Sequence, residues 1–284
     1  MDEPDHFDSW VARESVRFLK TYGGKQPLFL VSSFLKPHAP FTPPPRFIDP
    51  RWKETMKLPD TYGKANPDLL PRYIRGRLAI AEDTLHGLER ATLRLAMYNA
   101  CVGHMDHCVG EVMRGLEEAG ILDDTIVVYT ADHGEMRGEH GLWDKFVFYE
   151  ASAGVPLLMR VPGVTRAGAV CKAPVSQVAL VPTLLDLCGL AVPAHLDEPS
   201  LAPFLRDPSR PQTRPVYSEF TIGGKAEKYL IRSGDWKYSH YMGDTPELYN
   251  LHEDPEEMNN LATSAAHREA ADRFHNELLT WRAH

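Results

Sequence analysis

An aspartate, a histidine and a glycine stand next to one another at Asp132, His133 and Gly134, directly after the apolar run 125–130. A carboxylate and an imidazole one residue apart can bind the same divalent cation when the loop that carries them is tight. Gly134 allows the backbone bend that such a tight loop requires. The alternative is an Asx-turn with a histidine that faces solvent. The sequence therefore indicates a candidate metal-binding turn.

A second histidine, His38, lies in the proline-rich segment 36–41, and a lysine, Lys145, follows closely behind the metal-binding turn. Prolines on both sides of His38 fix φ and hold the imidazole in one direction, as a proton donor to a leaving group requires. The ammonium of Lys145 can neutralise negative charge on substrate oxygens. A purely structural histidine and a surface lysine are the alternatives. Glu135, Glu139 and His140 lie between these candidates and either support the pocket or face solvent.

The elements around these residues are typical of an α/β protein. Two segments have the apolar spacing of amphipathic helices, 6–22 and 91–118. Three apolar runs are typical of strands buried in a parallel sheet, and they are 28–35, 125–130 and 155–161. The order of helix 91–118 and strand 125–130 indicates a βαβ crossover. Because ligand sites in open sheets lie at the carboxyl ends of strands, His38 and Asp132 are expected at one rim of the sheet.

The C-terminal third has a different pattern. Two short apolar runs, 229–232 and 236–241, flank Ser233-Gly234-Asp235 and predict an antiparallel hairpin. A closing helix carries Phe274, Leu278 and Trp281. We therefore divide the chain into an α/β body over residues 1–200 and an antiparallel subdomain with a closing helix over residues 201–284.

Composition excludes several classes of protein. The chain has 284 residues, of which 43% are hydrophobic, and no apolar run approaches the roughly 18 residues of a membrane-spanning helix. The formal charge of −8 disfavours binding to nucleic acid. Four cysteines without C-x-x-C spacing are expected to be free thiols. Acidic residues rather than an apolar segment follow Met1, so no secretory signal is recognised. A cytoplasmic location is then the default, unless a preceding segment carries a signal.

Five segments, taken together and in this order, resemble the type I sulfatases, especially the branch of iduronate-2-sulfatase and choline-sulfatase. The segments are residues 28–41 with Lys36-Pro37-His38, residues 130–146 with Asp132-His133-Gly134, residues 155–163, residues 182–185, and residues 247–256 with Glu247-Leu248-Tyr249-Asn250-Leu251. Each motif is short, but their common order over residues 25–262 is specific.

The resemblance implies a fold and a chemistry. The implied fold is the alkaline-phosphatase-like α/β fold, with a sheet sandwiched by helices and a smaller antiparallel C-terminal subdomain. The implied reaction is hydrolysis of a sulfate monoester, from a sulfated small molecule or sugar, by a formylglycine made from Cys or Ser in a C/S-x-P/A-x-R motif. Asp132 and His133 would be ligands of a divalent cation, calcium above all. His38 would contact the sulfate and protonate the leaving oxygen, Lys145 would bind a sulfate oxygen, and Lys36 and His140 would contact the substrate.

The chain departs from the family pattern at the nucleophile. None of its four cysteines begins the motif, and Ser9, four residues before Arg13, lacks the proline or alanine that the motif requires. The paired aspartates that supply the other metal ligands in the family are also absent. The resemblance therefore implies the C-terminal part of a sulfatase, whose partner would be the missing N-terminal segment or, in a homo-oligomer, another copy. Without the leading strands, the sheet is expected to expose an apolar edge.

Two other functions remain open from the sequence. A phosphonate monoester hydrolase or phosphodiesterase of the same superfamily also carries an Asp-His-Gly metal turn. A sulfatase-like fragment without catalytic activity would explain the absent nucleophile. Substrate choice is expected to depend on the loops 39–75 and 220–246, whose shape side-chain type alone does not fix.

Overall fold

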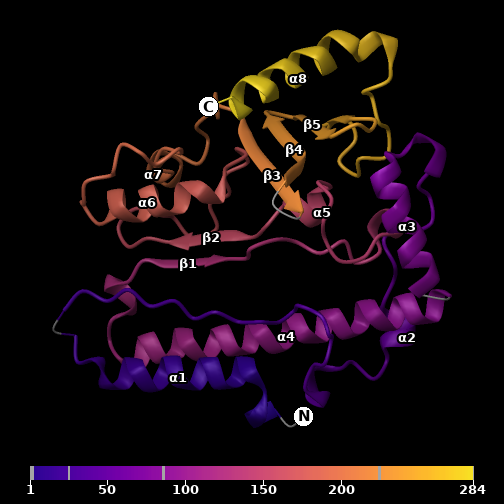
Figure 1. The fold of residues 1–284 in the computed structure, drawn as a ribbon. Coiled ribbons are helices and arrows are strands. Elements are labelled where there is room, and N and C mark those ends of the chain that lie inside the picture. The colour runs from indigo at the N-terminus through magenta and orange to yellow at the C-terminus, as the bar shows by residue number, and fades with distance from the viewer. Residues whose placement is uncertain (1–2, 25, 85–86, 223–224, 284) are drawn as a thin grey trace.

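Two long helices form one layer of the computed structural model, which describes residues 3–24, 26–84, 87–222 and 225–283 (Figure 1). They are α1 (Phe7–Tyr22) and α4 (Leu88–Glu118), in line with the predicted helices. The apolar stripe predicted for α1 does not face α4, because Phe7 is 51% and Phe18 is 44% exposed. The buried residues of α1 are instead mostly small or polar, and they are Asp8, Ser9, Ala12 and Ser15, together with Leu19. They allow the two helices to approach closely.

The segment at residues 28–35 was predicted as a buried strand, and this prediction is wrong. The segment runs along the two helices without regular secondary structure and pairs with no strand in the described part of the chain (Figure 1). One side contacts α1, where the hydroxyl oxygens of Ser32 and Ser15 lie 2.8 Å apart. The other side is bare, with Phe29 81% and Val31 69% exposed. The segment is therefore an exposed apolar stretch rather than the sheet edge that was predicted.

The strand before the candidate metal-binding turn has the predicted position but not the predicted sheet. β1 (Val127–Thr130) pairs with β2 (Leu157–Arg160) in a two-stranded antiparallel sheet, in the register Thr130↔Leu157. The parallel βαβ crossover is not seen among the described residues, because residues 28–35 form no strand ahead of α4 and β1 pairs only with the antiparallel β2. Only one edge of β1 is paired in this part of the structure, and Leu158 of β2 is 60% exposed.

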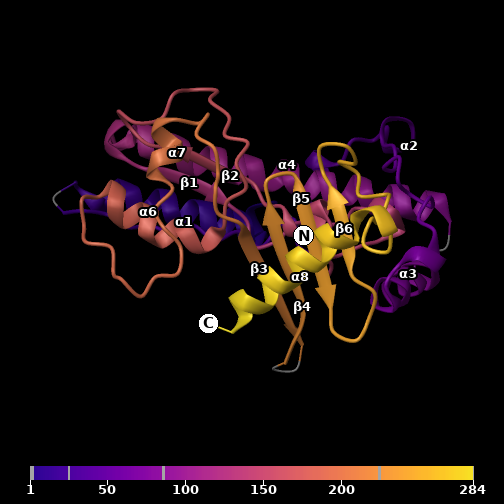
Figure 2. The same cartoon turned by 90° about the horizontal axis from the view of Figure 1, so that it is seen from above.

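The C-terminal part contains the antiparallel sheet that the sequence predicts. Its order is β3 (Val216–Ile222), β4 (Lys225–Ser233), β5 (Trp236–Tyr241) and β6 (Glu247–Asn250). Helix α8 (Arg268–Arg282) lies across one face of this sheet (Figure 2) and buries Phe274 and Leu278 against it. The boundary at residue 200 between the two parts stays a prediction.

Shorter helices connect these layers: α2 (Trp52–Thr55), α3 (Arg72–Thr84), α5 (Glu150–Ala153), α6 (Leu180–Leu187) and α7 (Ala202–Arg206). One apolar cluster joins α3, the loop after β1 and the C-terminal sheet, and it includes Ile74, Leu142, Tyr149, Tyr241 and Tyr249. This cluster fixes the loop of the metal-binding turn against the C-terminal sheet. No helix in the described ranges combines the length and apolar character needed to cross a bilayer.

Candidate active site

The candidate metal-binding turn follows the last residue of β1. Nδ1 of His133 lies 2.7 Å from the carbonyl oxygen of Gly134. Nδ1 therefore carries the proton and donates it, which leaves the lone pair of Nε2 free. This Nε2 lies 3.6 Å from Oδ2 of Asp132, and the side chains are 33% and 88% exposed. The two atoms fit two ligands of one divalent cation, and a calcium ion would need further oxygen ligands from elsewhere.

Glycine is required at the third position of this turn for a steric reason. The N–H of Gly134 donates to the carbonyl oxygen of Ser152 at 2.8 Å, so the turn lies directly against the end of α5. A Cβ atom at Gly134 would overlap the carbonyl oxygen of Ala151 and approach that of Gly154 to 2.9 Å. These backbone atoms cannot move aside as a flexible side chain can. The close approach therefore fixes the position of Asp132 and His133.

We expect Gly134→Ala to lower the free energy of unfolding by at least about 2 kcal/mol, because it forces backbone atoms apart. Gly76→Ala is the matched control, since Gly76 lies in α3 with open space around its Cα. That variant should raise the stability by about 0.5–1 kcal/mol, the usual gain when alanine replaces a helical glycine. Urea unfolding of both variants measures the difference. Equal stability of Gly134→Ala and the wild type would contradict the tight turn.

His38 and Lys145 lie in direct contact although 107 positions separate them. Nε2 of His38 lies 2.7 Å from Nζ of Lys145, and Nδ1 lies 2.6 Å from the carbonyl oxygen of Ala39. Because an ammonium only donates, Nε2 accepts from Lys145 while Nδ1 donates to Ala39. The His38 ring centroid lies 6.3 Å from that of His133. The structure thus brings together Asp132, His133, His38 and Lys145, as the sequence predicts.

The loop that carries Lys145 has an unusual backbone. Asp144 and Phe146, on either side of the lysine, have positive φ values of 65° and 84°. Such conformations cost about 1–3 kcal/mol each in non-glycine residues and persist only where surrounding contacts impose them. Here Glu135 accepts the N–H of Asp144 at 2.7 Å, and Arg94 donates to the Asp144 carboxylate at 2.7 Å. These contacts hold Lys145 in its direction toward His38.

Two residues predicted to contact the substrate are placed differently by the structure. The ammonium of Lys36 donates to the carbonyl oxygens of Pro40 at 2.6 Å and His38 at 3.3 Å, and the residue is only 7% exposed. His140 is 4% exposed and stacks on Tyr149 with ring centroids 4.1 Å apart. Burial lowers the pKa of His140 to about 4, so it is neutral. Lys36 braces the loop of His38 and His140 is a core residue, which corrects both predictions.

Two positioning residues were missed by the sequence analysis. The buried carboxylate of Asp8 accepts the N–H of Leu35 at 2.6 Å and lies 3.3 Å from the N–H of Lys36, just before His38. The amide of Gln177 donates to the carbonyl oxygen of Ala131 at 2.6 Å, just before the metal-binding turn. Both contacts join residues that are far apart along the chain. No local spacing in the sequence signals them.

Comparison with known protein families identifies the family to which the chain belongs. The family model described as "Sulfatase" matches residues 3–190, which include all four residues that the structure brings together. The chain belongs to the sulfatase family. A second model, "N-sulphoglucosamine sulphohydrolase, C-terminal", matches residues 138–284 of this sulfatase. The match covers the four-stranded sheet and α8.

Individual relatives agree with the family. The sulfatase is 33% identical over 250 residues to the choline-sulfatase of Rhizobium meliloti, covering 84% of this chain and 47% of the relative. It resembles the solved phosphonate monoester hydrolase of Agrobacterium radiobacter, with a TM-score of 0.77 and 26% identity over 100% of this chain and 62% of that one. It shares its fold with a protein solved with its substrate D-glucosamine-2-N,6-O-disulfate, with a TM-score of 0.81 and 24% identity, covering 97% and 69%. The sulfatase chain spans about half the length of the curated relatives it matches.

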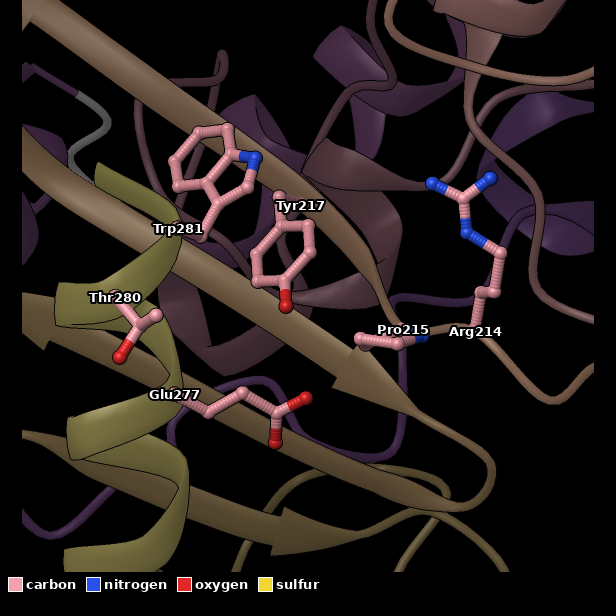
Figure 3. Close-up of a pocket in the computed structure, with 6 residues that line it drawn as sticks. All are labelled: Arg214, Pro215, Tyr217, Glu277, Thr280 and Trp281. Atoms are coloured by element: carbon pink, nitrogen blue, oxygen red, sulfur yellow. The ribbon is translucent and has the colours of Figure 1, made fainter. Parts of the chain in front are cut away.

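A pocket on the C-terminal sheet of the sulfatase is separate from this site. It has a volume of about 380 Å³ and is lined by Arg214, Pro215, Tyr217, Glu277, Thr280 and Trp281 (Figure 3). The rings of Tyr217 and Trp281 are parallel, with centroids 4.7 Å apart. These residues come from β3, α8 and the segment before β3. None of the candidate catalytic residues lines this pocket.

Proposed function

We propose that this chain supplies the proton donor, the sulfate-binding lysine and two metal ligands of an enzyme that hydrolyses sulfate monoesters. The observation that carries the proposal is the 2.7 Å contact between Nε2 of His38 and Nζ of Lys145, beside the turn of Asp132 and His133. A cation site, an ammonium and an imidazole around one point can gather the negative charge of a sulfuryl group and protonate its leaving oxygen. Sulfate esters of small molecules or sugars are the proposed substrates.

The metal proposed for this site is calcium, held by Asp132 and His133 together with ligands from outside the described turn. Both ligand atoms are open, and the neutral Nε2 and the carboxylate suit a divalent ion. When bound, such an ion draws negative charge from the oxygens of the transferring group. Residues of the chain bind the sulfate and transfer the proton. When substrate binds, the Lys145 ammonium leaves His38 for one sulfate oxygen, and the freed Nε2 takes up a proton from solvent. His38 then gives this Nε2 proton to the leaving oxygen and returns to the neutral form, while Nδ1–H stays on the carbonyl oxygen of Ala39.

The nucleophile of the proposed reaction comes from another polypeptide segment. No cysteine of this chain begins a C/S-x-P/A-x-R motif, and the one serine that does, Ser264 of Ser264-Ala265-Ala266-His267-Arg268, lies just before α8 in the C-terminal part rather than on the elements that carry His38 and Lys145. We propose that the segment carrying the motif lies against residues 28–35 and the unpaired edge of β1. The exposed side chains Phe29 and Val31 support this place, since burying them stabilises the complex by about 25 cal/mol per Å² of apolar surface.

The test is to co-purify the full chain with the part of choline-sulfatase that this chain does not cover, after maturation of its formylglycine. An aryl sulfate, an aryl phosphate diester and a phenylphosphonate monoester are then compared as substrates. We expect the highest kcat/KM for the sulfate, and no turnover by either part alone. The phosphonate hydrolase is the second candidate because of its 0.77 TM-score at 26% identity. Faster diester or phosphonate turnover would favour it, and an inactive pair would leave only a non-catalytic fragment.

A further inference from the structure

Four side chains with metal-binding atoms gather between the start of α1 and the middle of α4. They are His6, Asp8, His104 and Cys108, and all four are buried. The cluster belongs to other elements than the turn of Asp132 and His133. His6 and Asp8 stand two residues apart, and His104 and Cys108 lie one helical turn apart on α4. A spacing of four residues places His104 and Cys108 on one face of α4, and the turn at the start of α1 brings the N-cap residue His6 beside Asp8.

Three side chains of this cluster have ligand atoms close enough together for one metal ion, and Cys108 adjoins them through His104. One ligand atom each of His6, Asp8 and His104 lies within 4.8 Å of the others. Nδ1 of His6 lies 3.4 Å from Oδ2 of Asp8, and Sγ of Cys108 lies 3.6 Å from Nε2 of His104. Ligand bonds of about 2.0–2.3 Å at tetrahedral angles separate neighbouring ligand atoms by roughly 3.3–3.6 Å. Two pairs in the cluster have this separation.

The protein does not use the full binding capacity of His104. Its ring is completely buried, and Nδ1 has no hydrogen-bond partner in the described part of the chain. Nε2 contacts the hydroxyl of Ser9 at 2.9 Å. Because Nε2 is the nitrogen that faces Cys108, it is the atom available to a metal ion, and Nδ1 carries the imidazole proton. The His6 ring lies edge-on to that of His104, with centroids 4.5 Å apart.

We propose that His6, Asp8, His104 and Cys108 bind a divalent transition-metal ion, with zinc as the ion that best fits the donor set. Two imidazoles, one carboxylate and one thiolate suit zinc, whereas calcium and magnesium prefer oxygen ligands alone. Oδ2 of Asp8 is the oxygen that faces His6, because Oδ1 accepts the N–H of Leu35 at 2.6 Å. On binding, the thiol proton of Cys108 passes to solvent and the metal replaces the contact of Ser9 with His104.

This site would be structural and would brace the His38 loop. The carboxylate of Asp8 already binds the backbone at Leu35 and Lys36, three and two residues before His38. A metal on Asp8 therefore joins α1, α4 and the segment that leads to His38. The ion lies apart from the reacting atoms. Its removal would loosen the scaffold without removing a group that touches the substrate.

The test uses the full chain with Asp132→Asn and His133→Ala, so that the active-site turn does not bind metal. After treatment with EDTA and dialysis, the protein is titrated with zinc alone. We expect one zinc per chain and a rise in Tm of about 5 °C at a hundredfold excess over the dissociation constant. Cobalt alone should give the intense visible bands of a tetrahedral site and a sulfur-to-cobalt charge-transfer band. No uptake, or an octahedral cobalt spectrum, would overturn the proposal.

Single variants identify the ligands. Cys108→Ser keeps the size of the side chain and should abolish the charge-transfer band and weaken zinc binding by more than about tenfold. His107→Ala is the matched control, because His107 lies on the same helix and contacts Glu3 and Glu111 instead. It should leave stoichiometry and spectrum unchanged. Equal zinc affinity of Cys108→Ser and the parent protein would refute the site even if a His104 variant does not fold.

Discussion

Lys145→Ala should lower kcat/KM for an aryl sulfate by about 100- to 1,000-fold in the co-purified protein, as loss of one donor to a developing oxyanion does. The ammonium lies 2.7 Å from Nε2 of His38, so it also sets the direction of the His38 imidazole. Lys145→Arg should restore only part of the activity, because a planar guanidinium does not replace a compact ammonium. Lys172→Ala, at an exposed lysine, is the control and should have no effect.

A second measurement tests the proposed role of His38 as the proton donor. His38→Ala should lower kcat/KM by about 100- to 10,000-fold for an alkyl or sugar sulfate, whose leaving oxygen needs a proton. The loss should be much smaller for 4-nitrophenyl sulfate, whose leaving group is stable as an anion. Because His38 and Lys145 are in contact, the effects of the two alanine substitutions should not add. Additive losses, or equal losses for both classes of leaving group, would refute the assigned roles.

The sequence predicts the residues of the site more accurately than the helices and strands that support them. Short motifs kept the chemistry-bearing residues recognisable, although the parallel-sheet rim expected to bring His38 and Asp132 together is not seen among the described residues. Lys36 and His140 belong to the same motifs but serve the scaffold. Their roles depend on burial, which the motif does not encode. The Lys36 ammonium donates to backbone carbonyl oxygens, and the His140 ring stacks on Tyr149. These contacts determine the role of each residue.

Long-range pairing explains the other differences. An apolar run such as 28–35 indicates burial, but a strand also needs a partner for its ladder, and the described residues contain none. The direction of the pair β1 and β2 is set by the connection between them rather than by their four-residue sequences. The contact face of α1 depends on Gly115 of α4, where a Cβ would lie 3.2 Å from Val16. The helical spacing alone predicts that the larger apolar residues of α1 form its contact face.

The family motif at residues 247–251 has a structural explanation. Glu247 is 2% exposed, and its carboxylate accepts hydrogen bonds from three tyrosine hydroxyls at 2.7–2.9 Å. Two donors, Tyr241 and Tyr249, belong to the C-terminal sheet, while Tyr149 belongs to the loop beyond Lys145. The cluster therefore ties the loop that follows Lys145 to the C-terminal sheet. A sequence shows the glutamate but not the three hydroxyls that converge on it.

Glu247→Ala should lower the free energy of unfolding by about 3–5 kcal/mol, because it leaves three buried hydroxyls without their acceptor. Tyr249→Phe removes a single donor and should cost about 1 kcal/mol, which makes it the matched comparison. Glu247→Gln keeps an acceptor oxygen, so its loss of unfolding free energy should lie between the losses of the other two variants. Urea unfolding measures all three variants. A loss for Glu247→Ala no larger than that for Tyr249→Phe would show that the carboxylate does not organise the cluster.

The pH dependence of this loss has a definite sign. Burial raises the pKa of Glu247 above its ordinary value, against the opposing effect of the tyrosine hydrogen bonds. A carboxyl whose folded-state pKa is raised binds its proton more tightly in the folded protein. Its contribution to stability is therefore greatest below the ordinary pKa of about 4.3 and falls as pH rises through the raised value. The stability difference between the wild type and Glu247→Gln should accordingly shrink from acidic to neutral pH, and growth of that difference would contradict the assignment.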